Sequence, residues 1–119
     1  MRVFLLLVLL QAALLPAGTG ISVKFGLDKK QVAAVERRGL LYISVQDFAK
    51  KFNIGYFYSS ANKKAELKFD NAVIKFTAKN PYIIITGRQD NKSTAWQMSL
   101  STLFYKEDIY VDIVSFQKY

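Results

Sequence analysis

Hydrophobic and polar residues alternate along most of the chain after residue 20, and this two-residue period is typical of β-strands with one buried face. The clearest case is the segment 64–77, in which Asp70 and Asn71 form a two-residue turn between two strands. Pairing the strands around this turn gathers the apolar residues on one side, namely Ala65, Leu67, Phe69, Ala72, Ile74 and Phe76. The other side carries Lys64, Glu66, Lys68 and Lys75, with Glu66 opposite Lys75 as a cross-strand ion pair. We therefore predict a hairpin with one core face and one solvent face.

Further strands are predicted where short apolar runs end at turn residues. They are residues 22–25, 32–36, 40–44, 54–60, 81–86, 94–100 and 108–113. The second and third form a hairpin, because Gly39 supplies the positive φ of a tight turn. The continuous apolar run 81–86 predicts a strand buried on both faces.

One segment has the period of a helix instead of a strand. Val45, Phe48, Ala49 and Phe52 recur at i, i+3, i+4 and i+7 and form a single apolar stripe. Ser44 precedes the stripe and is a favourable N-cap residue. We therefore predict a short helix that begins after Ser44.

The octets LYISVQDF (41–48) and IYVDIVSF (109–116) resemble each other. Aligned without gaps, they share a tyrosine and a phenylalanine, and Asp112 stands in the second octet where the cap Ser44 stands in the first. The alternative is coincidence, since any strand that runs into a capped helix has this pattern. We interpret the pair as a structural repeat, because a turn lies just before each octet and the spacing of 68 residues allows a full β-β-α-β-β unit between them.

The repeat leads to a specific expectation for the fold. We predict an α+β protein with small antiparallel sheets, one complete helix per repeat unit and two tandem β-β-α-β-β-like units. Only seven residues follow Asp112, so the second unit is expected to be truncated at the C-terminus, and the chain to be a fragment of a longer protein.

Residues 1–20 have the anatomy of a secretory signal peptide. Arg2 precedes an apolar run over residues 3–15, and Pro16 and small residues follow it. We predict cleavage before Ile21, which leaves one domain over residues 21–119. The alternative is an uncleaved membrane anchor, but this run is short against the roughly 20 residues that a membrane-spanning helix needs. The mature chain is then secreted, periplasmic or associated with the cell envelope, without a stable membrane span.

Composition excludes several kinds of chemistry. The chain has no cysteine and no histidine, so the usual ligands of zinc, copper and haem are missing, as is the commonest general base. The aspartates are scattered, and none lies in a calcium-loop pattern. Serines such as Ser59 and Ser99 have no histidine to activate them. We expect no catalytic residues, no metal site and no cofactor in this chain.

The mature chain is basic. Without Arg2 it has 16 Lys and Arg against 9 Asp and Glu, a net charge of about +7. Export favours anionic polymers of the cell envelope as partners over nucleic acid. The alternative is that the charge only keeps the domain soluble.

The sequence also resembles a known family. A hairpin leads into LYISVQDFAKKFNIGYFYSSANKKAELKF, and DNAVIKF, YIIITG and the second octet follow. Over residues 22–119 this order is similar to the copper amine oxidase N-terminal-like (stalk) domain, as found at the N-terminus of secreted bacterial N-acetylmuramoyl-L-alanine amidases. The chain departs from the family pattern at Asp112, where the family has Pro or Ser, and at Asn53, which lies where a Leu-Gly pair ends the family's helix.

The resemblance implies a non-catalytic N-terminal domain of an exported peptidoglycan hydrolase, either cell-wall-associated or a spacer. Zinc is then expected only in a downstream amidase domain of the same polypeptide. The alternative is a stand-alone exported binding or adhesion module for peptidoglycan or another anionic envelope glycan. Its candidate binding residues are Tyr56, Tyr58, Lys63, Lys64, Lys68 and Lys75. A solvated strand face would explain the same lysines. Trp96 could stack on a sugar or belong to the core.

Overall fold

The computed structural model describes residues 20–118, which form a mostly β domain with two short helices. Ten strands make two five-stranded antiparallel sheets. The first sheet has the order β1-β2-β3-β10-β9, and its strands are Gly20–Phe25, Asp28–Arg37, Leu40–Ser44, Asp108–Asp112 and Leu103–Tyr105. The second has the order β4-β5-β6-β7-β8, and its strands are Gly55–Ser59, Lys64–Lys68, Ala72–Thr77, Tyr82–Gly87 and Ser93–Gln97.

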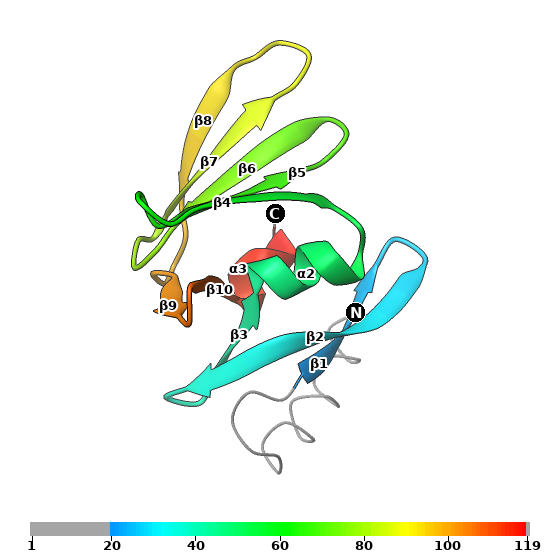
Figure 1. The fold of residues 1–119 in the computed structure, drawn as a ribbon, viewed down its shortest axis with the longest axis vertical. Helices are drawn as coiled ribbons and strands as arrows, with labels where there is room; N and C mark the ends of the chain where they lie inside the picture. Colours follow the sequence, from blue (N-terminus) through cyan, green and yellow to red (C-terminus); the bar gives the residue numbers. More distant parts are fainter. Residues whose placement is uncertain (1–19, 119) are drawn as a thin grey trace.

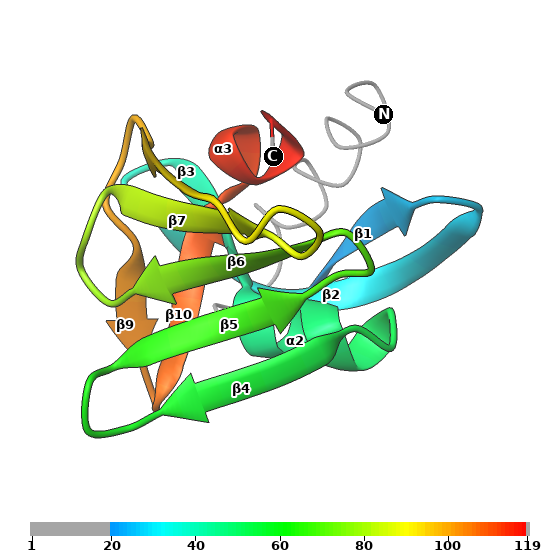
Figure 2. The same ribbon diagram turned by 90° about the horizontal axis from the view of Figure 1, so that it is seen from above.

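The helices α2 (Val45–Lys51) and α3 (Ile113–Lys118) lie in the layer between the sheets (Figure 1). α2 packs against β4 and β5 of the second sheet as well as against strands of the first, whereas the main packing partners of α3 are β10 and β3. Viewed from above, α2 lies toward β4 and β5, and α3 lies beyond β7 (Figure 2). The two helices therefore lie on the same face of the second sheet, toward its opposite edges.

The core fills the space between the sheets around α2. Phe48 points from the helix into this space, with its side chain only 2% exposed. Its ring meets Phe25 of β1 edge-to-face at 5.5 Å and Phe52 at 5.1 Å. Ala65 and Leu67 of β5 belong to the same cluster. The apolar stripe of the helix and the apolar side of the hairpin thus meet in one core, as their periodicities require.

The hairpin predicted over residues 64–77 is confirmed in its register. Leu67 pairs with Ile74 and Ala65 pairs with Phe76. Beyond the strands, the Phe69 amide donates to the carbonyl of Ala72 at 2.8 Å and closes the turn. The two-residue turn sets this register locally, so the sequence was sufficient to predict it.

The β2–β3 and β9–β10 hairpins have matching two-residue turns. The φ angles are 53° and 77° at Arg38 and Gly39, and 50° and 59° at Lys106 and Glu107. Positive φ at both central positions is the geometry of the hairpin turns that follow the twist of the strands. Each turn ends immediately before the strand that carries its octet, so the two turns occupy equivalent positions in the two units.

The two octets pair with each other in the centre of the first sheet. Strands β3 and β10 are antiparallel, and Ile43 lies opposite Val111, its equivalent in the ungapped alignment of the octets. The pairs on either side are Tyr42 with Asp112 and Ser44 with Tyr110. This register places a local two-fold axis through the Ile43 and Val111 pair, because exchanging the two octets reproduces the same pairs.

Both helices begin with the same kind of cap. The Ser44 hydroxyl accepts a hydrogen bond from the Asp47 amide at 2.9 Å, and the Asp112 carboxylate accepts one from the Ser115 amide at 3.0 Å. Each bond satisfies an amide that the first turn of a helix leaves unpaired. The predicted caps are confirmed. The two helices are of nearly equal length, since α2 has 7 residues and α3 has 6.

Some predictions need correction. The class is mostly β rather than α+β, because both helices are short, while the antiparallel sheets and the helix after Ser44 are confirmed. Strand β7 is not buried on both faces, since Ile84 is 40% exposed. Glu66 lies opposite Lys75 as predicted, but the described residues form no ion pair there. The predicted signal peptide lies outside the described residues except for Gly20, the first residue of β1.

Candidate functional site

The second sheet turns one side away from the core, and we call this side the outer face. It is defined by Phe57 on β4, Lys64, Glu66 and Lys68 on β5, Lys75 on β6, and Tyr82 and Ile84 on β7. Phe57 is 52% exposed and Tyr82 is 50% exposed. Large aromatic side chains on an open sheet face, next to several lysines, make this face the candidate binding surface of the domain.

Strand alternation places the three lysines on this face. Lys64 and Lys68 flank the buried residues of β5, and Lys75 lies between the buried residues of β6. The Lys68 ammonium lies 5.9 Å from the centroid of the Phe57 ring, within the range of a cation–π contact. In the part of the chain that the structure describes, the one ion pair joins Lys51 to Asp47, away from this face. The three ammonium groups therefore face solvent without a carboxylate within 4 Å.

Tyr56 and Tyr58 lie on the opposite side of the sheet from the three lysines. Their register partners are Leu67 and Ala65, both buried, and the two tyrosine rings pack against the core. Burial is the main cause that raises the pKa of Tyr56 to about 12, and its buried hydroxyl has no hydrogen-bond partner. The Tyr58 hydroxyl donates to Glu107 at 2.7 Å, and desolvation followed by this bond raises its pKa to about 12. Both tyrosines stabilise the contact between the sheets.

Lys63 also lies apart from the outer face. It occupies the turn between β4 and β5 with a φ of 52°, and its ammonium lies 5.1 Å from the centroid of the Phe104 ring on β9. Of the six predicted binding residues, the structure thus brings Lys64, Lys68 and Lys75 together and separates the other three from them. Whether the lysines bind a ligand stays a prediction.

The aromatic and aliphatic members of the outer face were not predicted from the sequence. Phe57 lies between Tyr56 and Tyr58, so the two-residue period alone would have put its side chain on the side of the sheet away from theirs. In the structure Phe57 lies on that side, opposite Glu66. Tyr82 and Ile84 belong to the continuous apolar run of β7. Because polar and apolar residues do not alternate in this run, the sequence did not indicate which of its residues are exposed. Their exposure follows from the position of the sheet at the surface.

A buried polar network holds the start of α2. The Asp108 carboxylate accepts hydrogen bonds from the Ser44 hydroxyl and, at 3.4 Å, from the Gln46 amide. Burial raises the pKa of Asp108, and these hydrogen bonds oppose the shift. Ser44 is fully buried and Asp108 is 7% exposed. Because no substrate can reach the pair, we interpret it as a structural link between β10 and the first helix.

Residues 20–118 contain neither a candidate metal site nor a candidate membrane-spanning helix. No group of three or more acidic side chains is placed to hold a metal ion there. None of the described helices has the length and apolar character needed to cross a membrane.

Fold and surface together define a mostly β domain with two antiparallel sheets and a basic, aromatic outer face. No family model, curated protein or solved structure matches the chain.

Proposed function

We propose that the chain is a non-catalytic, cell-wall-associated domain of an exported peptidoglycan hydrolase, an N-acetylmuramoyl-L-alanine amidase, and that its outer face contacts an anionic wall polymer. The observation that carries the binding proposal is the grouping of Lys64, Lys68 and Lys75 with Phe57 and Tyr82 on one exposed face. The alternative is a stand-alone exported binding or adhesion module that uses the same face for anionic envelope glycans.

The chemistry of the outer face suits such a polymer. Ammonium groups attract the carboxylates or phosphates of the wall, and the aromatic rings offer flat apolar surfaces to sugar rings. Each exposed charge pair contributes roughly 0.2–1 kcal/mol, so a useful affinity needs several contacts along a repeating ligand. A sheet face that presents several lysines to a polymer with regularly spaced charges meets this need.

The proposed parentage rests on the tandem units and on the family resemblance. Two hairpins have matching turns, two helices have the same kind of cap, and the two octets pair with each other in the centre of the first sheet. These features support two tandem β-β-α-β-β-like units. These paired features occupy equivalent positions when the two octets are aligned. The family with this order of elements occurs at the N-terminus of secreted amidases. In this proposal the zinc-dependent chemistry belongs to a downstream catalytic domain.

Binding to purified sacculi tests the outer face. The triple variant Lys64→Glu, Lys68→Glu and Lys75→Glu is expected to weaken binding by about tenfold or more, because three attractive contacts become repulsive. Binding of the unchanged chain should also weaken as salt rises to about 0.5 M, since salt screens exposed charges. The measurement is co-sedimentation of the full chain with sacculi over a range of salt concentrations.

The matched control carries the same change in charge elsewhere. Lys30, Lys79 and Lys92 are exposed and lie off the outer face, and their replacement by glutamate is expected to leave most of the binding intact. Equal losses in the two triple variants would mean that net charge alone attracts the chain. That result, or binding that does not depend on salt, would contradict the proposed role of the outer face.

The parent enzyme has its own test, independent of the binding face. The gene is expected to continue beyond the codon for Tyr119 into a domain with the His and Glu ligands of a zinc amidase. A stop codon within a few positions, or a domain without such ligands, would contradict the parentage. Salt-sensitive binding to sacculi together with that result would favour the stand-alone module.

A further inference from the structure

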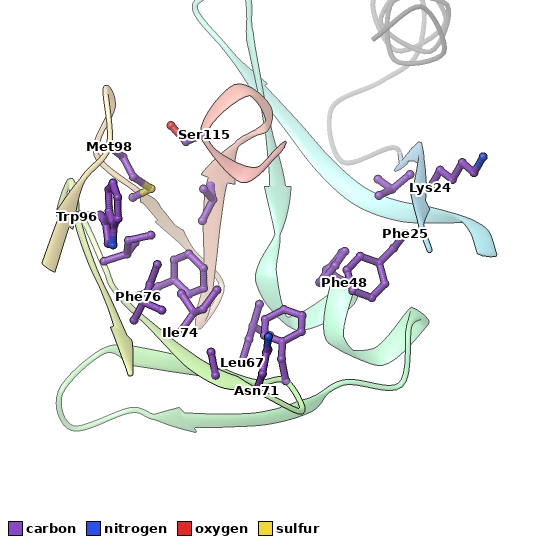
Figure 3. A pocket seen from close by; sticks show the side chains of 16 residues that line it. Lys24, Phe25, Phe48, Leu67, Asn71, Ile74, Phe76, Trp96, Met98 and Ser115 are labelled. Atoms are coloured by element: carbon purple, nitrogen blue, oxygen red, sulfur yellow. The ribbon is translucent and has the colours of Figure 1, made fainter. Parts of the chain in front are cut away.

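An apolar cleft of about 680 Å³ lies between the inner face of the second sheet and the layer below it, and it extends from β1 and α2 to α3. Figure 3 shows Trp96 and Met98 on one side of the cleft, Ser115 of α3 above it, and Ile74 and Phe76 on its floor. Lys24, at the side where β1 lies, is the one charged residue among the described residues of the lining. Most of the lining is therefore apolar, which suits apolar side chains as occupants.

The local two-fold axis shows what differs between the two sides of the domain. α2 and α3 are equivalent about the Ile43 and Val111 pair, and both begin at a capped first turn. On the α2 side, the hairpin of β4 and β5 covers the helix, and Phe48 and Leu67 meet in the core. On the α3 side, the helix packs mainly against β10 and β3, and no described strand takes the place of that hairpin. The cleft reaches from Val111 and Ser115 on this side to Phe48 and Leu67.

Among the described strands, β8 forms the edge of the second sheet on this side. All five of its residues are exposed, and none of them is charged or a proline. Charges and prolines are the usual means by which an edge strand is protected from pairing with another chain. Trp96 points toward the cleft and is 45% exposed, and Thr94 lies on the same side of the strand, opposite Ile85. The edge and the cleft are therefore open at the same place.

We propose that the cleft is a docking site for a β-hairpin supplied by a partner polypeptide. One strand of the partner adds to the edge of β8, and its alternate aromatic or aliphatic side chains enter the cleft below α3. This mode combines main-chain hydrogen bonds along the edge with apolar contacts at every second residue. The local symmetry defines the chemistry of the partner, because the hairpin that covers α2 presents Tyr56, Tyr58, Ala65 and Leu67 on its inner side.

A peptide with the sequence of residues 54–69 tests this site, since it copies the hairpin that covers α2. Trp96 is the only tryptophan of the chain, and the peptide contains none, so tryptophan fluorescence reports the cleft directly. Adding the peptide to the full chain is expected to shift the emission of Trp96 to shorter wavelength in a saturable manner, because the indole leaves water. A peptide of the same composition in scrambled order serves as the ligand control.

Two variants of β8 form a matched pair. Thr94→Lys places a charge at the mouth of the cleft and is expected to weaken peptide binding by about tenfold or more, because binding would desolvate the ammonium group. Ala95→Lys places the same charge on the other side of the strand, opposite Ile84, where the ammonium group stays in solvent, and it is expected to weaken binding clearly less than Thr94→Lys does. Circular dichroism and thermal unfolding verify that both variants fold.

Three results would overturn the proposal. They are no shift of Trp96 emission up to millimolar peptide, an equal shift with the scrambled peptide, and equal binding by the two β8 variants. Sedimentation of the chain alone tests the other occupant, a second copy. A dimer that the Thr94→Lys substitution dissociates would assign the cleft to self-association and would also overturn the proposal.

Discussion

Replacing Phe48 by alanine is expected to lower the free energy of unfolding by about 3–5 kcal/mol, the usual cost of removing a large aromatic side chain from a core. Phe48 is 2% exposed and is in contact with the rings of Phe25 and Phe52. The Phe48 ring joins α2 to β1 of the first sheet, so the cavity would open between these two elements. For a small domain with a stability of about 5–15 kcal/mol, such a loss removes a large share of the total.

Phe57→Ala is the matched control for this prediction. Phe57 is the same residue type, but it is 52% exposed on the outer face, where its ring is in contact with the Lys68 ammonium. Its replacement is expected to change the free energy of unfolding by less than about 1 kcal/mol. Urea unfolding with an unchanged m-value measures both effects. Similar losses in the two variants would contradict the assignment of Phe48 to the core.

Replacing Asp108 by alanine is expected to lower the free energy of unfolding by about 1–3 kcal/mol. The substitution removes the acceptor of the buried Ser44 hydroxyl and of the Gln46 amide, and a buried donor without a partner carries a desolvation penalty. Asp28 is exposed at the start of β2, and Asp28→Ala is expected to stay within about 0.5 kcal/mol. Equal stability of the two variants would contradict a structural role of Asp108.

The pKa of Asp108 adds a dependence on pH to this prediction. In the folded state the pKa of the Asp108 carboxyl lies above its ordinary value of 3.8, and burial is the largest cause of this shift. The folded state therefore binds the proton more tightly than the unfolded chain. This contribution to stability is fully present below pH 3.8 and is lost as the pH rises through the folded-state pKa.

The variant Asp108→Asn cannot ionise and isolates this contribution. The stability of the unchanged chain relative to Asp108→Asn is expected to be greatest at low pH and to fall as the pH rises through the folded-state pKa of Asp108. Urea unfolding of both proteins across the acidic and neutral range measures the difference. If the difference does not vary with pH, the Asp108 carboxyl has the same pKa in the folded and unfolded states, which would contradict this prediction.

Much of the local structure could be predicted from particular residues. Asp70 and Asn71 set the register of the β5–β6 hairpin, and Ser44 set the start of α2. Asn53 follows α2 with a φ of 60°, a left-handed conformation that asparagine tolerates at the end of a helix. Each of these features depends on residues within a few positions of one another, so the pattern along the chain contains the relevant interactions.

The candidate site could be predicted only in part. The alternation of β5 and β6 was enough to place Lys64, Lys68 and Lys75 on one face. Tyr56 and Tyr58 were expected beside them, but they lie on the inner side, where the first sheet and α2 cover them. A strand pattern states which residues share a side, and it does not state which side another layer will bury.

Local sequence was enough to define most of the strands, the tight turns between them, the caps of the two helices and the equivalence of the two octets, although β9 was not predicted. These features follow from backbone sterics and short-range hydrogen bonds. Tertiary packing set the rest: that the octets pair through Ile43 and Val111, that Trp96 lines a cleft and is 45% exposed, and that Asp108 supports the helix cap at Ser44 from a distant strand. Contacts between distant segments depend on how both sheets bury their apolar faces together, and no local pattern contains that information.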